Sequence, residues 1–384
     1  MAKLGEVCTI VSGSTPKTSV ASYWDGNIKW ITPAELNEDT FYIMDSVRHI
    51  TEEGKEKTGL SYLPTGTVIL SSRAPIGKTA IAGCKMCCNQ GFKNLICSDA
   101  IYNEYLYFFL KSKTDYLNSL GRGATFKEIS KSIVENIEIP LPEVNQQKEI
   151  AEKFKKLEQL ISLRKQQLAK LDELVKARFV EVFGDCKTNP KNWKTKALEK
   201  IANVGSSKRV FVEELQDSGI PFYRGTEIGA LAEKKAVIPA LFITEEHYKQ
   251  LCETTGKPQK GDLLMPSICP DGRIWIVDTD EPFYFKDGRV LWVHLTSANY
   301  NSVFLLYTLK DRIMTDYASI ASGTTFAELK IFALKKCKIF DVPLELQNQF
   351  ANFVERVDQQ KQAVQQSLDK LELMKKALMQ EYFG

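Results

Sequence analysis

Two long stretches of the chain repeat apolar residues at alternating spacings of four and three, the pattern of a coiled-coil helix. The first seam consists of Ile150, Phe154, Leu157, Ile161, Leu168, Leu171, Val175 and Val182. The second consists of Phe350, Val354, Val357, Val364, Leu368, Leu371, Leu378 and Tyr382. Basic residues fill the gaps in both, namely Arg164, Arg178, Lys361 and Lys375. The pattern predicts two long helices that pack with their seams buried.

The remaining segments predict short strands and helices. Apolar runs follow Gly66 and Gly261 and favour strands. Thr51 and Thr244 each precede two glutamates, which is typical of a helix N-cap with acids in the first turn. We expect strands at 67–70, 78–82, 262–265 and 273–277, and buried helices at 103–113 and 301–310.

The chain is an internal tandem repeat. Residues 168–184 and 368–384 match best, 200 positions apart, and both segments end in Phe-Gly. Weaker sequence matches extend through both halves, so each half is a divergent globular part followed by a better-matched helix. The expected domains are 1–142, a helix at 143–184, a polar linker at 185–193, a second globular domain at 194–342, and a second helix at 343–384.

This organisation predicts an α+β fold with two tandem mixed α/β domains, separated by two long coiled-coil helices. The helices should be antiparallel, because each domain must return the chain to the opposite end. Pro142 and Pro343 introduce the helices and stop the preceding strands from continuing into them.

Composition changes this picture little. The chain has 51 basic and 48 acidic residues, a net charge of +3, so any basic surface that binds a polyanion must be local. No stretch approaches the roughly 18 apolar residues of a membrane span. The start lacks the apolar core of a secretory signal. The nine cysteines therefore indicate reduced thiols in the cytoplasm.

Catalytic and metal-binding patterns are incomplete. Residues 76–79 resemble the end of a phosphate-binding loop, but Ser72 stands where that loop needs a glycine. Glu53 and Lys55, preceded by Asp45, resemble a nuclease core, yet the second copy lacks the lysine. A zinc site would need two close-spaced couples, and the cluster offers one couple with two strays: Cys84, Cys87, Cys88 and Cys97. Free thiols are the favoured interpretation.

The order of several motifs, twice over, resembles the specificity subunit of type I restriction–modification enzymes. The matching segments are the domain openings at 4–7 and 198–201, the glycine-bounded segments 66–77 and 261–272, the small-residue turns 123–125 and 323–325, the proline–glutamine helix entries 142–147 and 343–347, and the central junction with Phe183, Asn189 and Trp193.

The resemblance implies a non-catalytic protein that reads a split double-stranded DNA target, one half with each domain. Its implied partners are two modification (methyltransferase) subunits and restriction (endonuclease and translocase) subunits, with no membrane. S-adenosylmethionine, ATP and magnesium are expected only on those partners, so the chain itself should carry no cofactor. Two alternatives stay open: a coiled-coil interaction scaffold without DNA contact, and an enzyme with an unrecognised site.

Basic residues in glycine-flanked loops are the candidates for DNA contact, because the backbone can approach closely there. They are Lys17, Arg73, Lys78, Arg122 and Lys127 in the first domain, and Lys208, Arg209, Arg224, Arg273 and Arg289 in the second. Lys78 and Arg273 align between the halves, which favours phosphate contact. Arg73 and Arg224 are not shared, which suits sequence readout.

Overall fold

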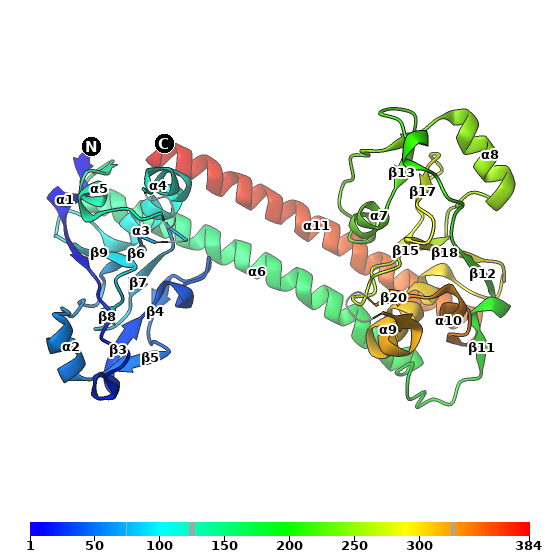
Figure 1. The fold of residues 1–384 in the computed structure, drawn as a ribbon, viewed down its shortest axis with the longest axis horizontal. Helices are drawn as coiled ribbons and strands as arrows, with labels where there is room; N and C mark the ends of the chain where they lie inside the picture. Colours follow the sequence, from blue (N-terminus) through cyan, green and yellow to red (C-terminus); the bar gives the residue numbers. More distant parts are fainter. Residues whose placement is uncertain (74, 123–126, 324–326) are drawn as a thin grey trace. The chain divides into compact units, whose positions relative to one another are not determined.

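The computed structural model describes residues 1–73, 75–122, 127–323 and 327–384. Contacts divide the chain into unit 1, residues 1–166 with 364–384, and unit 2, residues 167–363. Each unit combines one globular domain with parts of both long helices (Figure 1). Of the predicted small-residue turns at 123–125 and 323–325, residues 123–125 and 324–325 lie outside the described residues.

The first domain contains a five-stranded sheet in the order β2-β9-β6-β7-β4 and a three-stranded sheet in the order β5-β3-β8. The side chains of β6 and β7 are all buried, so the centre of the larger sheet is covered on both faces. The bounds are β2 Cys8–Ser12, β3 Trp24–Ile31, β4 Tyr42–Ile43, β5 Arg48–Ile50, β6 Val68–Ser71, β7 Thr79–Ala82, β8 Cys87–Cys88 and β9 Phe92–Cys97. A small ladder pairs β1 (Ala2–Lys3) with β10 (Glu138–Ile139).

Short helices connect these strands, and α3 supplies much of the core, with every residue from Glu104 to Leu110 buried. The helices are α1 Leu4–Val7, η1 Ala21–Tyr23, η2 Pro33–Glu35, α2 Glu52–Thr58, α3 Asn103–Ser112, α4 Thr114–Leu120 and α5 Lys131–Glu135.

The second domain repeats this plan with a four-stranded sheet, β12-β18-β15-β16, and a three-stranded sheet, β14-β13-β17. In both small sheets the middle strand has one parallel neighbour, β8 beside β3 and β17 beside β13. The strands are β12 Ala202–Gly205, β13 Ile220–Tyr223, β14 Phe242–Ile243, β15 Leu263–Pro266, β16 Trp275–Ile276, β17 Tyr284–Phe285 and β18 Val290–Leu295.

Further elements complete this domain: β11 Thr195–Ala197 paired with β21 Lys338–Phe340, β19 Ala321–Ser322 paired with β20 Glu328–Leu329, and the helices η3 Leu198–Lys200, η4 Val212–Glu214, α7 Gly225–Ala232, α8 Glu245–Thr255, α9 Ser302–Ile320 and α10 Ile331–Lys335. The strand expected at 273–277 is shorter, and the helix expected at 301–310 is longer, with a non-helical residue at Asp316. The predicted N-caps are confirmed: Thr51 accepts from the Gly54 N–H, and Thr244 from the His247 N–H.

The long helices are α6 (Val144–Phe183) and α11 (Leu344–Phe383). They are antiparallel in each unit, because contacts from successive positions of α6 reach progressively earlier positions of α11. The buried seam residues are Ile150, Phe154, Leu157, Ile161, Leu171, Val175, Phe350, Val354, Val357, Val364 and Leu368; Leu168, Leu371 and Leu378 are half-buried. The predicted fold class, α+β with two long antiparallel helices, is confirmed.

Three of the basic residues that interrupt the seams donate to side chains of the opposite helix: Arg164, Lys361 and Lys375. Arg164 donates from Nε to Ser367 at 3.2 Å in unit 1, and Lys361 donates to Asp172 at 2.6 Å in unit 2. Such pairs contribute little energy when exposed, but they favour one register of the helix pair over others.

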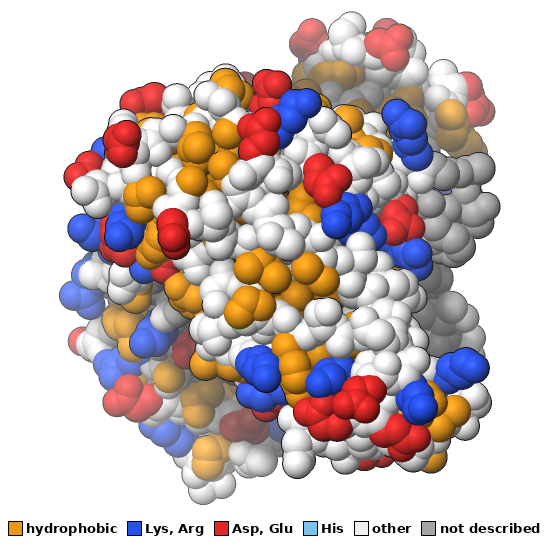
Figure 2. All heavy atoms as spheres, turned by 90° about the vertical axis from the view of Figure 1, so that its left-hand side faces the viewer, with side chains coloured by type: hydrophobic (Ala, Val, Ile, Leu, Met, Phe, Trp, Pro, Cys, Tyr) orange, Lys and Arg blue, Asp and Glu red, His pale blue; other side chains and the backbone are white. Residues whose placement is uncertain are grey.

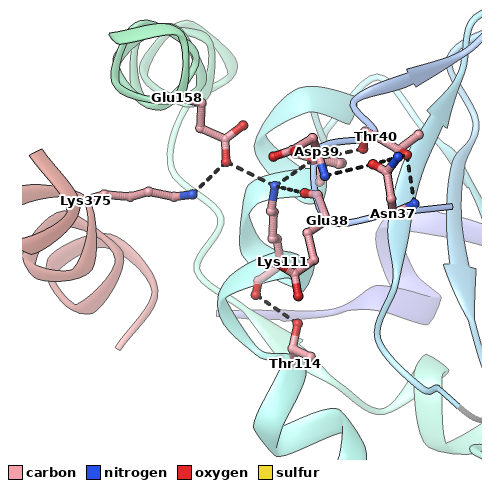
Figure 3. A network of polar contacts seen from close by, with 9 residues as sticks. Asn37, Glu38, Asp39, Thr40, Lys111, Thr114, Glu158 and Lys375 are labelled. Carbon is pink, nitrogen blue, oxygen red and sulfur yellow. Dashed lines mark hydrogen bonds and ion pairs between the residues drawn. The ribbon is translucent and has the colours of Figure 1, made fainter. Parts of the chain in front are cut away.

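A polar network joins the helix pair to the first domain (Figure 3). One Glu158 oxygen on α6 accepts from Lys111 of α3 at 3.1 Å and from Lys375 of α11 at 2.7 Å. The Lys111 ammonium also donates to the Glu38 carbonyl at 2.9 Å. One carboxylate therefore ties both helices of unit 1 to α3 and to the loop before β4.

A buried glutamine fixes the start of each long helix. Gln147, fully buried, accepts the Tyr102 N–H at 2.8 Å and donates to the Ala100 and Pro142 carbonyls at 3.0 and 2.8 Å. Gln347 makes the same three bonds in unit 2, to Asn301 N–H, Asn299 O and Val342 O, at 2.9, 3.1 and 2.9 Å. The amide thereby joins the first turn of the long helix to the loop before α3 or α9. None of the described helices combines the length and apolar composition that crossing a membrane requires.

We expect Gln147→Leu to lower the free energy of unfolding by about 3 kcal/mol, because the buried amide loses three hydrogen bonds that contribute about 1 kcal/mol each. The matched control is Gln146→Leu on the exposed side of the same turn, which should change it by less than about 0.5 kcal/mol. Urea unfolding followed by fluorescence measures both, and equal midpoints for the two variants would contradict the role of Gln147.

Candidate nucleic-acid interface

The basic side chains predicted to contact DNA lie mostly at the surface of the two domains. The exposed ones are Lys17, Arg73, Arg122, Lys127, Lys208, Arg209, Arg224 and Arg289, and the half-buried ones are Lys78 and Arg273. The intramolecular partners of each cation limit the contacts that it can make with DNA. Several of these cations pair with carboxylates or carbonyls of the protein.

A serine after the central strand organises the backbone around Arg73. The Ser72 N–H donates to the Gly91 carbonyl at 2.7 Å, and the Ser72 carbonyl accepts from the Ile129 N–H at 3.0 Å. Three segments remote in sequence therefore meet at Ser72, and the residue before Ile129, Glu128, lies beside the loop that carries Arg73.

Glu128 is held between two cations. Arg73 donates from Nε to Oε2 at 2.8 Å, and Lys93 donates to Oε1 at 3.2 Å. Partial burial alone would raise the pKa of Glu128, but the hydrogen bonds from Lys93 and Arg73 bring it below its ordinary value. The group carries a net positive charge, with Arg73 46% exposed and Lys93 only 8% exposed.

The second domain builds the same arrangement from other positions. The Ser267 N–H donates to the Arg289 carbonyl at 2.9 Å, and the Ser267 carbonyl accepts from the Leu329 N–H at 2.7 Å. Glu328, before Leu329, pairs with the Arg289 guanidinium and, at 3.3 Å, with Lys330. Arg289 is 58% exposed.

The equivalent serines show that the two guanidinium groups come from opposite sides of this arrangement. Ile268 in the second domain stands where the first has Arg73, and Gly91 in the first domain stands where the second has Arg289. The arginine therefore lies next to different strands in the two domains, whereas the glutamate that pairs with it occupies the corresponding position in both.

The aligned cations Lys78 and Arg273 have intramolecular partners. The Lys78 ammonium donates to the carbonyl of Leu36, the C-cap of η2, at 2.6 Å and to that of Pro33, the first residue of η2, at 3.2 Å. Arg273 lies near the end of α7, 3.9 Å from Glu233, and pairs with Asp271 at 2.8 Å. Cations are favourable at helix C-termini, so both residues stabilise corresponding turns; phosphate contact by either stays a prediction.

Arg224 occupies the N-cap position of α7. Its N–H and its guanidinium both donate to Glu227, at 2.9 Å each to Oε2 and Oε1. Thr32 stands at the corresponding place in the first domain, where its N–H donates to Glu35 at 2.8 Å. The same local cap therefore presents a guanidinium in one domain and a methyl and hydroxyl in the other.

The other predicted cations have few side-chain partners among the described residues. Arg209 pairs with Asp287 at 3.2 Å. Arg122 exchanges backbone hydrogen bonds with Glu128, and both line an open hollow of about 540 Å³ between α4 and α5. Contact with DNA by these residues, and by Lys17, Lys127 and Lys208, stays a prediction.

Sequence reasoning missed one group of stacked cations and aromatic rings in the first domain. The Arg48 guanidinium lies 3.5 Å from the ring centre of Trp24. Lys55 and Lys85 lie 4.3 and 3.7 Å from the Tyr62 ring centre. Trp24 is only 8% exposed and so offers no stacking surface to a base, whereas Tyr62 is half-buried beside its two cations. The sequence signal was weak, because the partners come from separate elements.

Figure 2 shows one face of the first domain, where basic and acidic side chains are interspersed and apolar groups lie between them. This mixture agrees with the net charge of +3. The view contains no continuous basic surface, so recognition of a polyanion here would depend on individual cations.

Among the described residues no three acidic, histidine or cysteine side chains are placed to hold a metal. Burial raises the pKa of Cys87 to about 11 and that of Cys88 to about 12, which disfavours the thiolate that binds zinc. Cys97 lies opposite Cys8 in the β2–β9 ladder, and all nine cysteines are free.

Comparison with known proteins gives one family. The family described as type I restriction modification DNA specificity domain (Methylase_S) matches residues 1–173 and 190–373. The chain is 32% identical over 376 residues to the specificity subunit of the type I restriction enzyme MjaIX of Methanocaldococcus jannaschii, covering 92% of this chain and 85% of the relative.

Two solved structures share the fold. One is the type I restriction–modification S subunit from M. genitalium, with a TM-score of 0.58, 16% identity and coverage of 100% of this chain and 95% of that one. The other comes from a study of complex assembly and conformational transition in a type I system, with a TM-score of 0.64, 18% identity and coverage of 100% and 96%.

The Arg224–Glu227 pair makes a pH-dependent contribution to stability. Burial alone would raise the pKa of Glu227, but hydrogen bonds from the Arg224 side chain and backbone and from Thr226 outweigh it and bring the pKa to about 2. A depressed carboxyl pKa stabilises the folded state above the ordinary value of 4.5, and this contribution is lost as the pH falls toward 2.

We therefore expect Glu227→Gln to lower the free energy of unfolding by about 1–2 kcal/mol at pH 7. The difference from wild type should shrink between pH 4.5 and 3. Glu253→Gln, at an exposed position of α8, is the control and should have little effect at any pH. Denaturant unfolding at several pH values checks this; a Glu227→Gln effect that grows toward low pH is the opposite of the expected result.

Proposed function

Because the chain belongs to the family of type I restriction–modification DNA specificity subunits, we propose that it reads a bipartite DNA target and directs methylation and cleavage by partner subunits. Each domain reads one half of the target. The specificity subunit is the non-catalytic component of these enzymes, so S-adenosylmethionine, ATP and magnesium would be bound by the partners. We infer that it acts in the cytoplasm, together with its DNA target and its partners.

The observation that carries this proposal is a shared scaffold with different exposed cations. Both domains have the serine-centred backbone arrangement and the buried glutamine. On that scaffold the second domain has Arg224 where the first has Thr32. The arginine that pairs with Glu128 in the first domain and with Glu328 in the second lies next to a different strand in each. Two readers of different half-sites need this combination, because base contacts specify sequence while the scaffold sets position.

The surface of the long helices supports docking of partner subunits. Several apolar side chains remain exposed there: Leu160, Leu163, Leu174, Val180, Leu373 and Met374. The small residues Ala177 and Ala377 are exposed at corresponding places. A helix pair with two similar faces can bind two copies of one partner by approximate twofold symmetry, which fits two modification subunits; restriction subunits would join that complex.

A coiled-coil scaffold without DNA contact is the alternative. Gel shift of the chain with its methyltransferase partner separates the two, because a scaffold would leave the mobility of every duplex unchanged.

We expect Arg224→Ala to relax the target in one half-site only. Its guanidinium has no counterpart at Thr32, and a lost bidentate base contact costs about 1–3 kcal/mol of discrimination. Methylome sequencing of cells carrying the variant complex gives the motif directly. Lys249→Ala removes a cation paired with a glutamate on α8 of the same domain and is the control. An unchanged motif at unchanged efficiency would remove Arg224 from the reading residues.

We expect two modification subunits to bind one copy of this chain. Native mass spectrometry at increasing partner concentration measures the ratio. Replacing Ala177 and Ala377 together by Glu should lower occupancy, because each adds a charged side chain to a docking face. A complex that stays one-to-one at saturating partner would count against the symmetric arrangement.

A further inference from the structure

We propose that Arg73 and Arg289 are the matched base-reading groups of the two domains, and that Glu128 and Glu328 are their positioning residues. In each domain one guanidinium is held by one carboxylate at the same point of the scaffold. This inference rests on the proposed DNA-binding function and identifies the chemistry it recognises: a guanine edge in the major groove, whose O6 and N7 accept from an arginine.

The equivalence of the two sites follows from backbone hydrogen bonds rather than from sequence alignment. Ser72 and Ser267 each bond to the residue before the next central strand, Gly91 or Arg289. Each serine also accepts from the residue after the acid. Glu128 and Glu328 therefore occupy corresponding places, although the arginines that meet them do not align.

The arginines reach these acids from opposite sides. Arg73 follows β6, at the place that Ile268 takes in the second domain, and Arg289 precedes β18, at the place that Gly91 takes in the first. A guanidinium at either position contacts the carboxylate at the corresponding place of its own domain, Glu128 or Glu328. The position of the charged group has thus been kept while its attachment to the chain differs.

A second cation makes the acid compatible with DNA. A lone glutamate would repel phosphates, but Lys93 neutralises Glu128 and Lys330 neutralises Glu328. The arginine therefore adds a net positive charge at each site. Because an ordered side chain loses less rotamer freedom on binding, the carboxylate also makes a base contact by the arginine more favourable.

Exposure separates this role from a purely structural one. Arg73 and Arg289 are 46% and 58% exposed, and ion pairs at such exposure contribute little to stability. The Arg73 pair uses Nε, which leaves Nη1 and Nη2 for two parallel bonds to guanine. The Arg289 pair uses Nη1, which leaves the edge formed by Nε and Nη2. Lys93, at 8% exposure, is the buried and structural member of its group.

The test uses the full chain with its methyltransferase partner and methylome sequencing. Wild type must first give a bipartite motif; if it gives none, the proposed function fails and not this inference. We expect Arg73→Ala to reduce discrimination at one base pair of one half-site by about 10- to 100-fold. Arg289→Ala should do so in the other half-site. A uniform loss of methylation with an unchanged motif would overturn the base-reading role.

The positioning role has its own readout. Glu128→Gln should weaken discrimination at the base pair that Arg73→Ala affects, and Glu328→Gln at the one that Arg289→Ala affects, in variants that circular dichroism shows to be folded at the assay temperature. Loss of discrimination elsewhere in the motif would overturn the positioning role. Lys57→Ala on α2 and Lys249→Ala on α8, both exposed, should leave the motif unchanged.

A transfer of the arginine between strands gives the strongest test. Combining Arg289→Ala with Ile268→Arg moves the guanidinium of the second domain to the position used in the first. We expect the double variant to recover the lost preference at the same base pair, by at least about tenfold over Arg289→Ala alone. A folded double variant without recovery would overturn the equivalence of the two sites.

Discussion

The structure depends on one buried hydrogen-bonding group in each unit, the side-chain amide at the start of the long helix. Gln147 and Gln347 are fully buried, and each amide is satisfied by one backbone N–H and two backbone carbonyls. An unpaired buried group costs about 1–3 kcal/mol, so this geometry strongly favours one direction for the helix as it leaves its domain. Core packing of Phe154 against Phe383 in unit 1, and of Phe183 against Phe350 in unit 2, then completes the attachment.

The near-neutral charge of the chain fits the proposed role in reading a specific DNA sequence. Proteins that bind any DNA sequence rely on many phosphate contacts, whereas a specificity subunit needs few cations in exact places. Here Arg73, Arg224 and Arg289 each lie beside a carboxylate. The acids reduce the total charge and limit the conformations of the arginines, which favours selective contacts over general attraction.

Internal duplication explains how the two domains can differ without losing their common frame. The backbone bonds around Ser72 and Ser267 involve main-chain groups, which any sequence supplies. Side chains on that frame can therefore change, as at Thr32 and Arg224, at no cost to the sheet. The helices lack this freedom, because seam positions must stay apolar to be buried.

The sequence by itself determined the helices, their seams, the internal repeat, the N-caps at Thr51 and Thr244, and the family, since these depend on local periodicity and on motif order. Only the tertiary structure decided which cations share an acid. Arg73 lies 55 positions from Glu128, and Arg289 lies 39 positions from Glu328. No local rule links residues so far apart; their contact exists because strand pairing brings both segments to one serine.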